Sequence, residues 1–351
     1  KFRFMNYASL PSNTQVPSIR GNGDHWHIDI VYLNKNRNSV DSLPNDVGFT
    51  KPLSSLLKDY QSIPWKHFSS QAKESELTNP LTLNIKYINL SPDKWDITRR
   101  FIITDLSNLN APYPASGGSY PILAYRTEEY IRDYEYDFLS NWEDSAKYCM
   151  ESYLITNSPE KYLRWNDTIR FTQQFLNYYA YDDGSAENGY GIFGEGSDNG
   201  RVAIKYHSYL PDSLKQIMIY FNRSYNNANQ QYFKLTVWKD LNGKPGDILY
   251  QKIGLKPIYR DSLNQFTYYS IDSPLKINGD FWIGWVNTTD DFLNVGFDLN
   301  NIHNDKLYYN LNGTWVESQF KGSLMIRPVF GKITHNPTVV EKPISQVDFT
   351  L

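Results

Sequence analysis

The chain has 351 residues, of which 40% are hydrophobic and 16% aromatic. Its net charge of −3, with both signs interspersed, excludes nucleic acid as the main partner, because phosphate binding requires a basic patch. No apolar run approaches the roughly 18 residues of a membrane-spanning helix, and the single cysteine excludes an intrachain disulfide and thiolate metal sites. The length predicts two or three domains, and the aromatic enrichment favours β-structure.

Residues 1–35 contain the pattern of a β-strand and are expected to be the end of a domain. The run DHWHIDIV at 24–31 alternates apolar and polar side chains, which is the periodicity of a half-buried strand. It resembles the last strand of jelly-roll domains of the MAM and carbohydrate-binding-module type. The resemblance implies that residues 1–35 are the C-terminal part of a jelly roll whose remainder lies upstream.

Residues 36–79 are predicted to form a connector with one short helix. Thr50 is the expected cap, Pro52 lies in the first turn, and the helix is expected within 52–60 and to end before Pro64. Residues 80–176 contain short β-type runs separated by turn residues, which predicts an immunoglobulin-like (Ig-like) sandwich.

Residues 177–331 contain further short strands separated by Asn-Gly and Pro-Gly turns, which predicts a jelly-roll-like antiparallel sandwich. Residues 332–351 lose this periodicity and are typical of a linker. The predicted fold class is therefore all-β, with tandem antiparallel β-sandwiches: a partial jelly roll, an Ig-like sandwich and a jelly-roll-like sandwich.

Two motifs mark the ends of the third unit: AYDDGSAENGYG at 180–191 and GSLMIRPVFG at 322–331. This pair resembles the C-terminal β-sandwich of secreted Bacteroidota proteins that carry a type IX sorting domain. The resemblance implies export by the type IX secretion machinery to the medium or the outer-membrane surface of a Gram-negative bacterium. It also implies that 332–351 lead to a sorting domain that is not in the sequence.

Two acidic or histidine-rich clusters are candidate metal sites. His25, His27 and Asp29 lie on one strand face and fit zinc, while the jelly-roll resemblance implies structural calcium at Asp29. The alternative for this triplet is a polar solvent face. The second cluster contains the carboxylates Asp182, Asp183 and Glu187 around Gly184, and they are possible calcium ligands. The alternative is a tight turn whose Asp side chains bind local backbone amides.

Exposed aromatic side chains and modification signals are the remaining candidates. Trp282, Trp238 and Trp315 are candidate glycan-binding residues, with Trp282 expected on the face opposite the core-facing Trp285; core packing is the alternative. The resemblance to Bacteroidota proteins implies O-glycosylation where Asp-Ser/Thr precedes a small or aliphatic residue. The matching acceptors are Ser42, Ser145, Thr168, Ser213 and Ser262.

No nucleophile with a base, zinc-protease helix or phosphate loop is recognisable, so the protein is expected not to be an enzyme and to need no cofactor beyond structural calcium. The first hypothesis is an exported surface protein serving in adhesion, glycan binding or as a structural stalk. Its expected partners are the secretion machinery and a glycan or surface protein. Two alternatives remain: accessory domains of a hydrolase or protease whose catalytic domain lies upstream, and a component or passenger bound to the secretion machinery.

Overall fold

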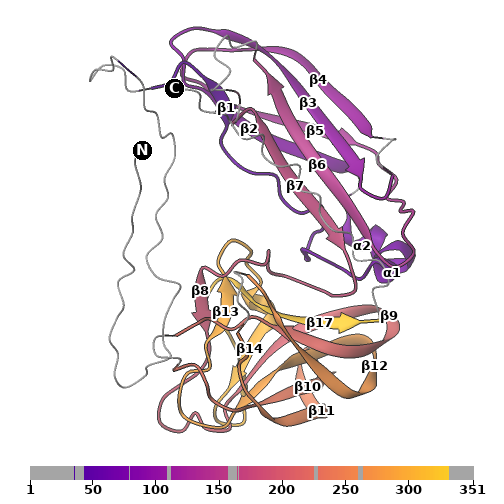
Figure 1. The fold of residues 1–351 in the computed structure, drawn as a ribbon, viewed down its shortest axis with the longest axis vertical. Coiled ribbons are helices and arrows are strands. Elements are labelled where there is room, and N and C mark those ends of the chain that lie inside the picture. Colours follow the sequence, from indigo (N-terminus) through magenta and orange to yellow (C-terminus); the bar gives the residue numbers. More distant parts are fainter. Residues whose placement is uncertain are drawn as a thin grey trace.

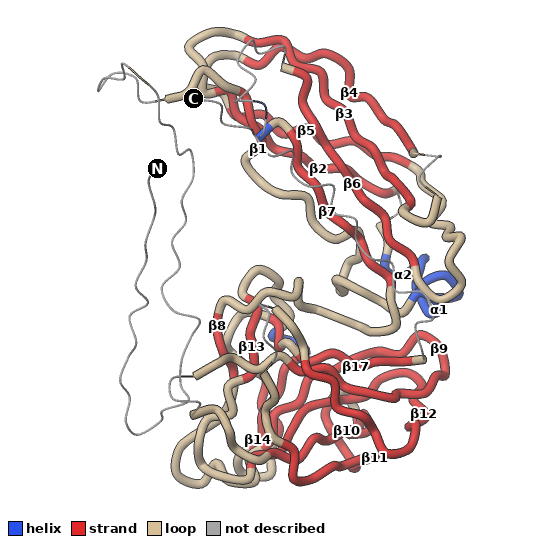
Figure 2. Tube along the Cα trace, viewed as in Figure 1, coloured by secondary structure: helices blue, strands red, loops and turns tan. Residues whose placement is uncertain are grey.

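The computed structural model of the chain describes residues 35, 43–78, 80–108, 112–156, 164, 166–224, 228–259 and 264–331. The expected jelly-roll strand with His25, His27 and Asp29 lies outside the described residues, as does the expected linker 332–351. The described part is all-β with antiparallel sheets, which confirms the predicted fold class. Two sandwich-like units follow one another along the chain (Figure 1), and Figure 2 shows strand throughout both with only short helical segments.

The first sandwich contains two antiparallel sheets. The three-stranded sheet has the order β1 (Val47–Phe49), β2 (Leu81–Asn89), β5 (Thr127–Tyr134). The four-stranded sheet has the order β4 (Tyr113–Ile122), β3 (Trp95–Asp105), β6 (Ala146–Ile155), β7 (Thr168–Phe175). The side chains of β2 alternate between buried and more exposed, because one face of the strand covers the core. The sandwich begins with β1, inside the segment that was expected to be a connector.

The helix lies later than the sequence predicted. Residues 52–60 form no helix, and the backbone N–H and hydroxyl of Thr50 both donate to the carbonyl of Lys86, which extends the β1–β2 pairing. The helical segment instead begins after Pro64 with α1 (Trp65–His67), continues through a π-helical turn (Phe68–Ala72) and ends with α2 (Lys73–Glu76). The expected N-cap was therefore wrong, because Thr50 pairs with Lys86 of β2, 36 positions away, and no helix follows it.

The second sandwich is built on a large sheet of seven strands. Its order is β11 (Lys244–Leu255), β10 (Phe233–Leu241), β12 (Thr267–Asn287), β9 (Arg201–Ile219), β14 (Leu307–Asn310) and β15 (Trp315–Glu317), with β17 (Ile326–Phe330) also paired to β9. A smaller sheet has the order β16 (Ser323–Leu324), β13 (Val295–Asp298), β8 (Asn188–Tyr190). A short 3₁₀ helix (Asn304–Lys306) precedes β14. No helix in the described ranges is both long and apolar enough to cross a membrane.

A buried aromatic junction joins the two sandwiches. Ser62 pairs with Ala180 as an isolated antiparallel bridge, so the segment between β1 and β2 (residues 50–78, called the linker from here on) adds backbone hydrogen bonds to the start of the second unit. Tyr60 is 3% exposed and stacks on Tyr181, with ring centroids 4.6 Å apart. Its hydroxyl also accepts the backbone N–H of His207 at 3.1 Å. The linker is therefore packed against the second sandwich.

His67 adds a polar contact at the same junction. Its Nδ1 lies 2.6 Å from the Tyr179 hydroxyl and its Nε2 lies 3.1 Å from Asp212 Oδ2. Burial lowers the pKa of His67, although the hydrogen bond with Asp212 acts in the opposite direction. The His67 side chain has 0% exposure, so this Tyr–His–Asp arrangement holds the two units together and is closed to a substrate.

Candidate functional site

The last third of strand β12, residues 281–287, is buried on both faces. Phe281, Ile283 and Trp285 belong to the main hydrophobic core, whereas Trp282 and Val286 point to the opposite, outer face of the large sheet. A separate cluster forms there, with buried Ala203, Trp238, Trp282 and Val286 and partly buried Tyr308 and Trp315. We call Trp238, Trp282, Tyr308 and Trp315 the outer aromatic cluster. The structure thus brings together the three tryptophans that the sequence singled out.

The cluster has two layers. Trp238 stands opposite Trp282 in the β10–β12 pairing, and these two indoles are 1% and 0% exposed. Trp315 packs edge-to-face on Trp238 with centroids 5.7 Å apart, and Tyr308 packs in the same way on Trp282 at 5.1 Å. Trp238 and Trp282 form the lower layer, and the half-buried Trp315 and Tyr308 form the upper layer.

The expectation that Trp282 offers an exposed ring was therefore wrong. Its face of the strand was predicted correctly, but Tyr308 covers it from β14, and Trp238 is covered from β15. An indole without an exposed face cannot stack on a sugar ring. The rings available to a ligand are those of Trp315 and Tyr308.

Small residues make room for this arrangement. Trp238 is on β10 and Trp315 is on β15, and strands β12, β9 and β14 lie between them. Neighbouring strands are about 4.8 Å apart, so the Trp315 side chain reaches Trp238 only by lying across the outer face of the sheet. Between them Thr236 pairs with Gly284, and Gly284 pairs with Ala203. A Cβ atom on Gly284 would lie 1.9 Å from the carbonyl oxygen of Val202, so only glycine permits the close approach of β9 and β12.

Four polar side chains form a rim beside the cluster: Lys205, His207, Asp240 and Asp280. Lys205 lies opposite Trp282 in the sheet register and His207 lies opposite Asp280. Lys205 Nζ is 2.6 Å from Asp280 Oδ2 and 3.7 Å from Asp240 Oδ1, while His207 Nδ1 is 2.5 Å from Asp280 Oδ1. We call these four residues the polar rim. All four are partly exposed, so they are accessible to a ligand.

Ion pairs hold the rim side chains in place, and a hydrogen bond links the rim to the lower aromatic layer. Partial burial opposes ionisation of Asp280, but hydrogen bonds from Lys205 and His207 outweigh this effect and lower its pKa. The indole N–H of Trp282 donates to Asp240 Oδ1 at 2.8 Å. The indole N–H of Trp238, in contrast, is buried without a hydrogen-bond partner. The lower layer of the site therefore retains one unused donor.

The acidic cluster near Gly184 is a pair of turns joined to a buried ion pair. Asp182 accepts the Gly184 N–H and forms a bidentate ion pair with the buried guanidinium of Arg327. Asp183 accepts the N–H and hydroxyl of Ser185, and Glu187 accepts the N–H of Leu299. Among the described residues, no group of three or more His, Cys, Asp or Glu side chains converges as metal ligands would. The oxygens of this cluster are directed to amides, hydroxyls and Arg327 rather than to a common point.

The described modification candidates differ in accessibility. Ser145 is 0% exposed, so a transferase cannot reach it in the folded chain, contrary to the accessibility expected of an acceptor. Thr168 begins the edge strand β7 and Ser213 lies within β9, and both are half-buried. Ser42 and Ser262 lie outside the described residues.

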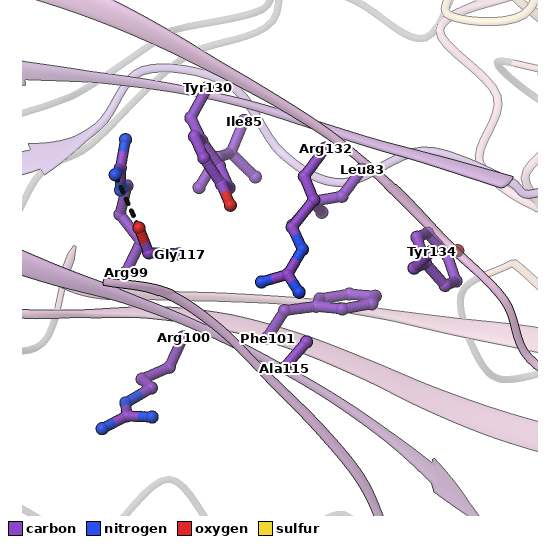
Figure 3. Close-up of a pocket in the computed structure, with 10 residues that line it drawn as sticks. All are labelled: Leu83, Ile85, Arg99, Arg100, Phe101, Ala115, Gly117, Tyr130, Arg132 and Tyr134. Carbon is purple, nitrogen blue, oxygen red and sulfur yellow. Dashed lines mark hydrogen bonds between the residues drawn. The ribbon is translucent and has the colours of Figure 1, made fainter. Parts of the chain in front are cut away.

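A small cleft lies between the edges of the two sheets in the first sandwich (Figure 3). Its walls are mainly apolar and include Leu83, Phe101 and Tyr130. Arg99 lies over the rings of Tyr120 and Tyr130, at 4.9 and 4.1 Å from their centroids, and donates to the carbonyl of Gly117 at 2.7 Å. Because this guanidinium is held by the protein itself, the cleft is a weaker candidate site than the outer aromatic cluster.

Comparison with known proteins gives only remote likenesses. No protein-family model matches the chain, and no curated protein matches it. One similar solved structure is a two-domain protein of unknown function from Bacteroides fragilis, at 11% identity and a TM-score of 0.21, covering 76% of this chain and 98% of that one. Another is an F-type lectin (fucolectin) from striped bass serum, at 9% identity and a TM-score of 0.18, covering 72% of this chain and 93% of that one. The chain is a multi-domain β-rich protein with these distant structural resemblances.

Proposed function

We propose that this protein is a non-enzymatic glycan-binding protein and that the ligand lies on Trp315 and Tyr308 beside the polar rim. The observation that carries the proposal is the gathering of four aromatic side chains on the outer face of a sheet, outside the main core. Aromatic rings offer flat apolar surfaces, and a few convergent polar groups fix the orientation of a bound molecule. The rim supplies both acceptors and donors for sugar hydroxyls.

The buried pair Trp238 and Trp282 has a supporting role in this proposal. Edge-to-face packing on these two indoles fixes the rings of Trp315 and Tyr308 before a ligand arrives. Rings held in place in this way lose little conformational freedom on binding, which favours affinity. The site is thus proposed to be largely pre-formed.

The proposed setting is the outside of a Gram-negative bacterium. The AYDDGSAE and GSLMIRPVFG motifs support export by the type IX secretion machinery. Glycan binding at the cell surface or in the medium then serves adhesion, and the two sandwiches act as a stalk for the site. The Tyr179–His67–Asp212 arrangement at the junction supports the non-enzymatic part of the proposal, since the His67 side chain is 0% exposed and no substrate reaches it.

A glycan array followed by calorimetric titration of the best hit tests the proposal. Trp315→Ala is expected to weaken binding at least about tenfold, because removing a central aromatic contact typically costs more than 1 kcal/mol. Trp142→Ala, which removes a half-buried tryptophan from the first sandwich, is the matched control and should leave affinity unchanged. Equal affinity of Trp315→Ala and the unaltered protein, or no binding to any glycan, would refute the proposal.

A further inference from the structure

Two acidic side chains are buried at one end of the first sandwich. Asp46 directly precedes β1 and is 3% exposed, and Asp167 directly precedes β7 and is 5% exposed. They belong to different sheets. Asn166 links them, because its side-chain amide donates to Asp46 Oδ2 at 2.7 Å while its backbone continues into Asp167. Strand β7 ends beside the junction, so its beginning lies at the end away from the second sandwich (Figure 1).

The hydrogen bonds leave one oxygen of the Asp167 carboxylate without a partner. Thr156 donates to Asp167 Oδ2 at 3.2 Å, whereas Asp167 Oδ1 is buried without a partner. Burial chiefly, and then the nearby charge of Asp46, raise the pKa of Asp167 to about 7. The hydrogen bond with Thr156 and the charge of the exposed Arg164 both lower the pKa of Asp167, and Arg164 has the smaller effect. Buried carboxylates in proteins are usually paired with a cation or bound to a metal ion.

We propose that Asp46 and Asp167 bind a calcium ion that joins the two sheets at this end of the first sandwich. Oxygen donors are the ligands that calcium prefers, and it accepts carboxylates, amide carbonyls, hydroxyls and water in flexible geometry. The unpaired Asp167 Oδ1 and the carboxylate of Asp46 supply the charge, and the side chains of Asn166 and Thr156 add neutral oxygens. No histidine or cysteine takes part in these contacts, which disfavours zinc.

The backbone at this site is already held in place. The N–H of Leu90 donates to the Asp46 carbonyl and the N–H of Leu154 donates to the Asp167 carbonyl, both at 2.8 Å. Gly48 makes room for the Asn166 side chain next to the pair, because a Cβ atom there would lie 2.5 Å from the Asn166 amide nitrogen. An ion bound here would therefore stabilise the folded state without a large rearrangement.

Thermal melts of the full chain with calcium, with magnesium and with chelator test the proposal. Excess calcium is expected to raise the Tm by about 5 °C relative to chelator. A ligand at about 100 times its Kd adds 2–3 kcal/mol to the free energy of unfolding, and a gain of that size shifts the Tm of such a domain by several degrees. Magnesium at the same concentration should give a much smaller shift, because it requires stricter octahedral geometry.

Variants test which residues bind the ion. For each variant the Tm with calcium is compared with its own Tm in chelator, so a change in baseline stability does not affect the comparison. The calcium-dependent shift should be lost in Asp167→Asn and Asp46→Asn and kept in Asp183→Asn. The proposal is overturned by the lack of a calcium shift in the unaltered protein, by an equal shift with magnesium, or by a shift that survives Asp167→Asn. Loss of the shift in Asp183→Asn alone would place the ion at the turn near Gly184 and would also overturn it.

Discussion

At the residue scale, the ion pair between Asp182 and Arg327 joins two motifs that are distant in the sequence. Asp182 belongs to the AYDDG segment and Arg327 to the MIRPVF segment, and the two residues are 145 positions apart. Both are buried, and the guanidinium also lies over the rings of Tyr178 and Phe266 at 5.1 and 4.1 Å from their centroids. The two motifs thus meet in one buried ion pair within the second sandwich.

Arg327→Met is expected to lower the free energy of unfolding by about 3–5 kcal/mol, because it leaves the Asp182 carboxylate buried without its cation. Denaturant titration followed by tryptophan fluorescence measures the change. Asp272→Asn, which removes one partner of the exposed pair with Lys252, is the control and should leave the midpoint where it is. Similar midpoints for both variants would mean that the buried pair is not a major source of stability.

The stability of the first sandwich should fall as pH rises from about 4 to about 7. The folded pKa of Asp167 is about 7 against an ordinary value of 3.8, chiefly because of burial. Between these two pH values the folded state binds more protons than the unfolded state, so the free energy of unfolding decreases with pH and levels off above about 7. Asp167→Asn removes this dependence. Its stability relative to the unaltered protein should therefore increase from pH 4 to pH 8, as measured by denaturant titration in chelator; parallel pH curves would contradict this.

At the element scale, the outer face of the large sheet depends on the close approach of β9 and β12. Gly284→Ala is expected to cost at least about 3 kcal/mol, because its Cβ would collide with the Val202 carbonyl and separate the strands under the aromatic cluster. Gly254→Ala is a control in open space at a positive φ of 76°, where only backbone strain of about 1 kcal/mol applies. Chemical denaturation of both variants gives the comparison. A smaller loss for Gly284→Ala than for Gly254→Ala would contradict the tight pairing.

Local patterns predicted the elements but not what covers them. Period-2 alternation placed Trp282 and Trp285 on opposite faces of β12 correctly, because side-chain direction is a local property of a strand. The same alternation could have placed Lys205 and His207 on the outer face, because they alternate with the buried Ile204 and Tyr206. The burial of Trp282 was missed because its cover, Tyr308, comes from another strand. The helix was misplaced for the same kind of reason, since Thr50 binds a carbonyl on β2.

At the scale of the whole molecule, the junction couples the two sandwiches through contacts that no local pattern contains. Tyr60 meets His207 across 147 positions, and His67 meets Asp212 across 145. The rim residue His207 packs edge-to-face on Tyr209, whose hydroxyl bonds to Glu76 of the linker helix. The polar rim and the linker are therefore parts of one continuous network. This connection is the structural basis for expecting the two units to behave as one.

The unaltered protein is expected to unfold in a single calorimetric transition, and Tyr60→Ala should separate it into two. The substitution removes a ring stacked on Tyr181 and the acceptor for the His207 N–H, at a cost of about 3 kcal/mol to the junction. Tyr60→Phe keeps the ring and should have a smaller effect, and Tyr125→Ala, at a side chain 58% exposed, should have none. Small-angle scattering should show a larger radius of gyration for Tyr60→Ala alone. If that variant kept one transition and the original radius, the junction would owe its rigidity to the Ser62–Ala180 backbone bridge and His67 rather than to the aromatic stack.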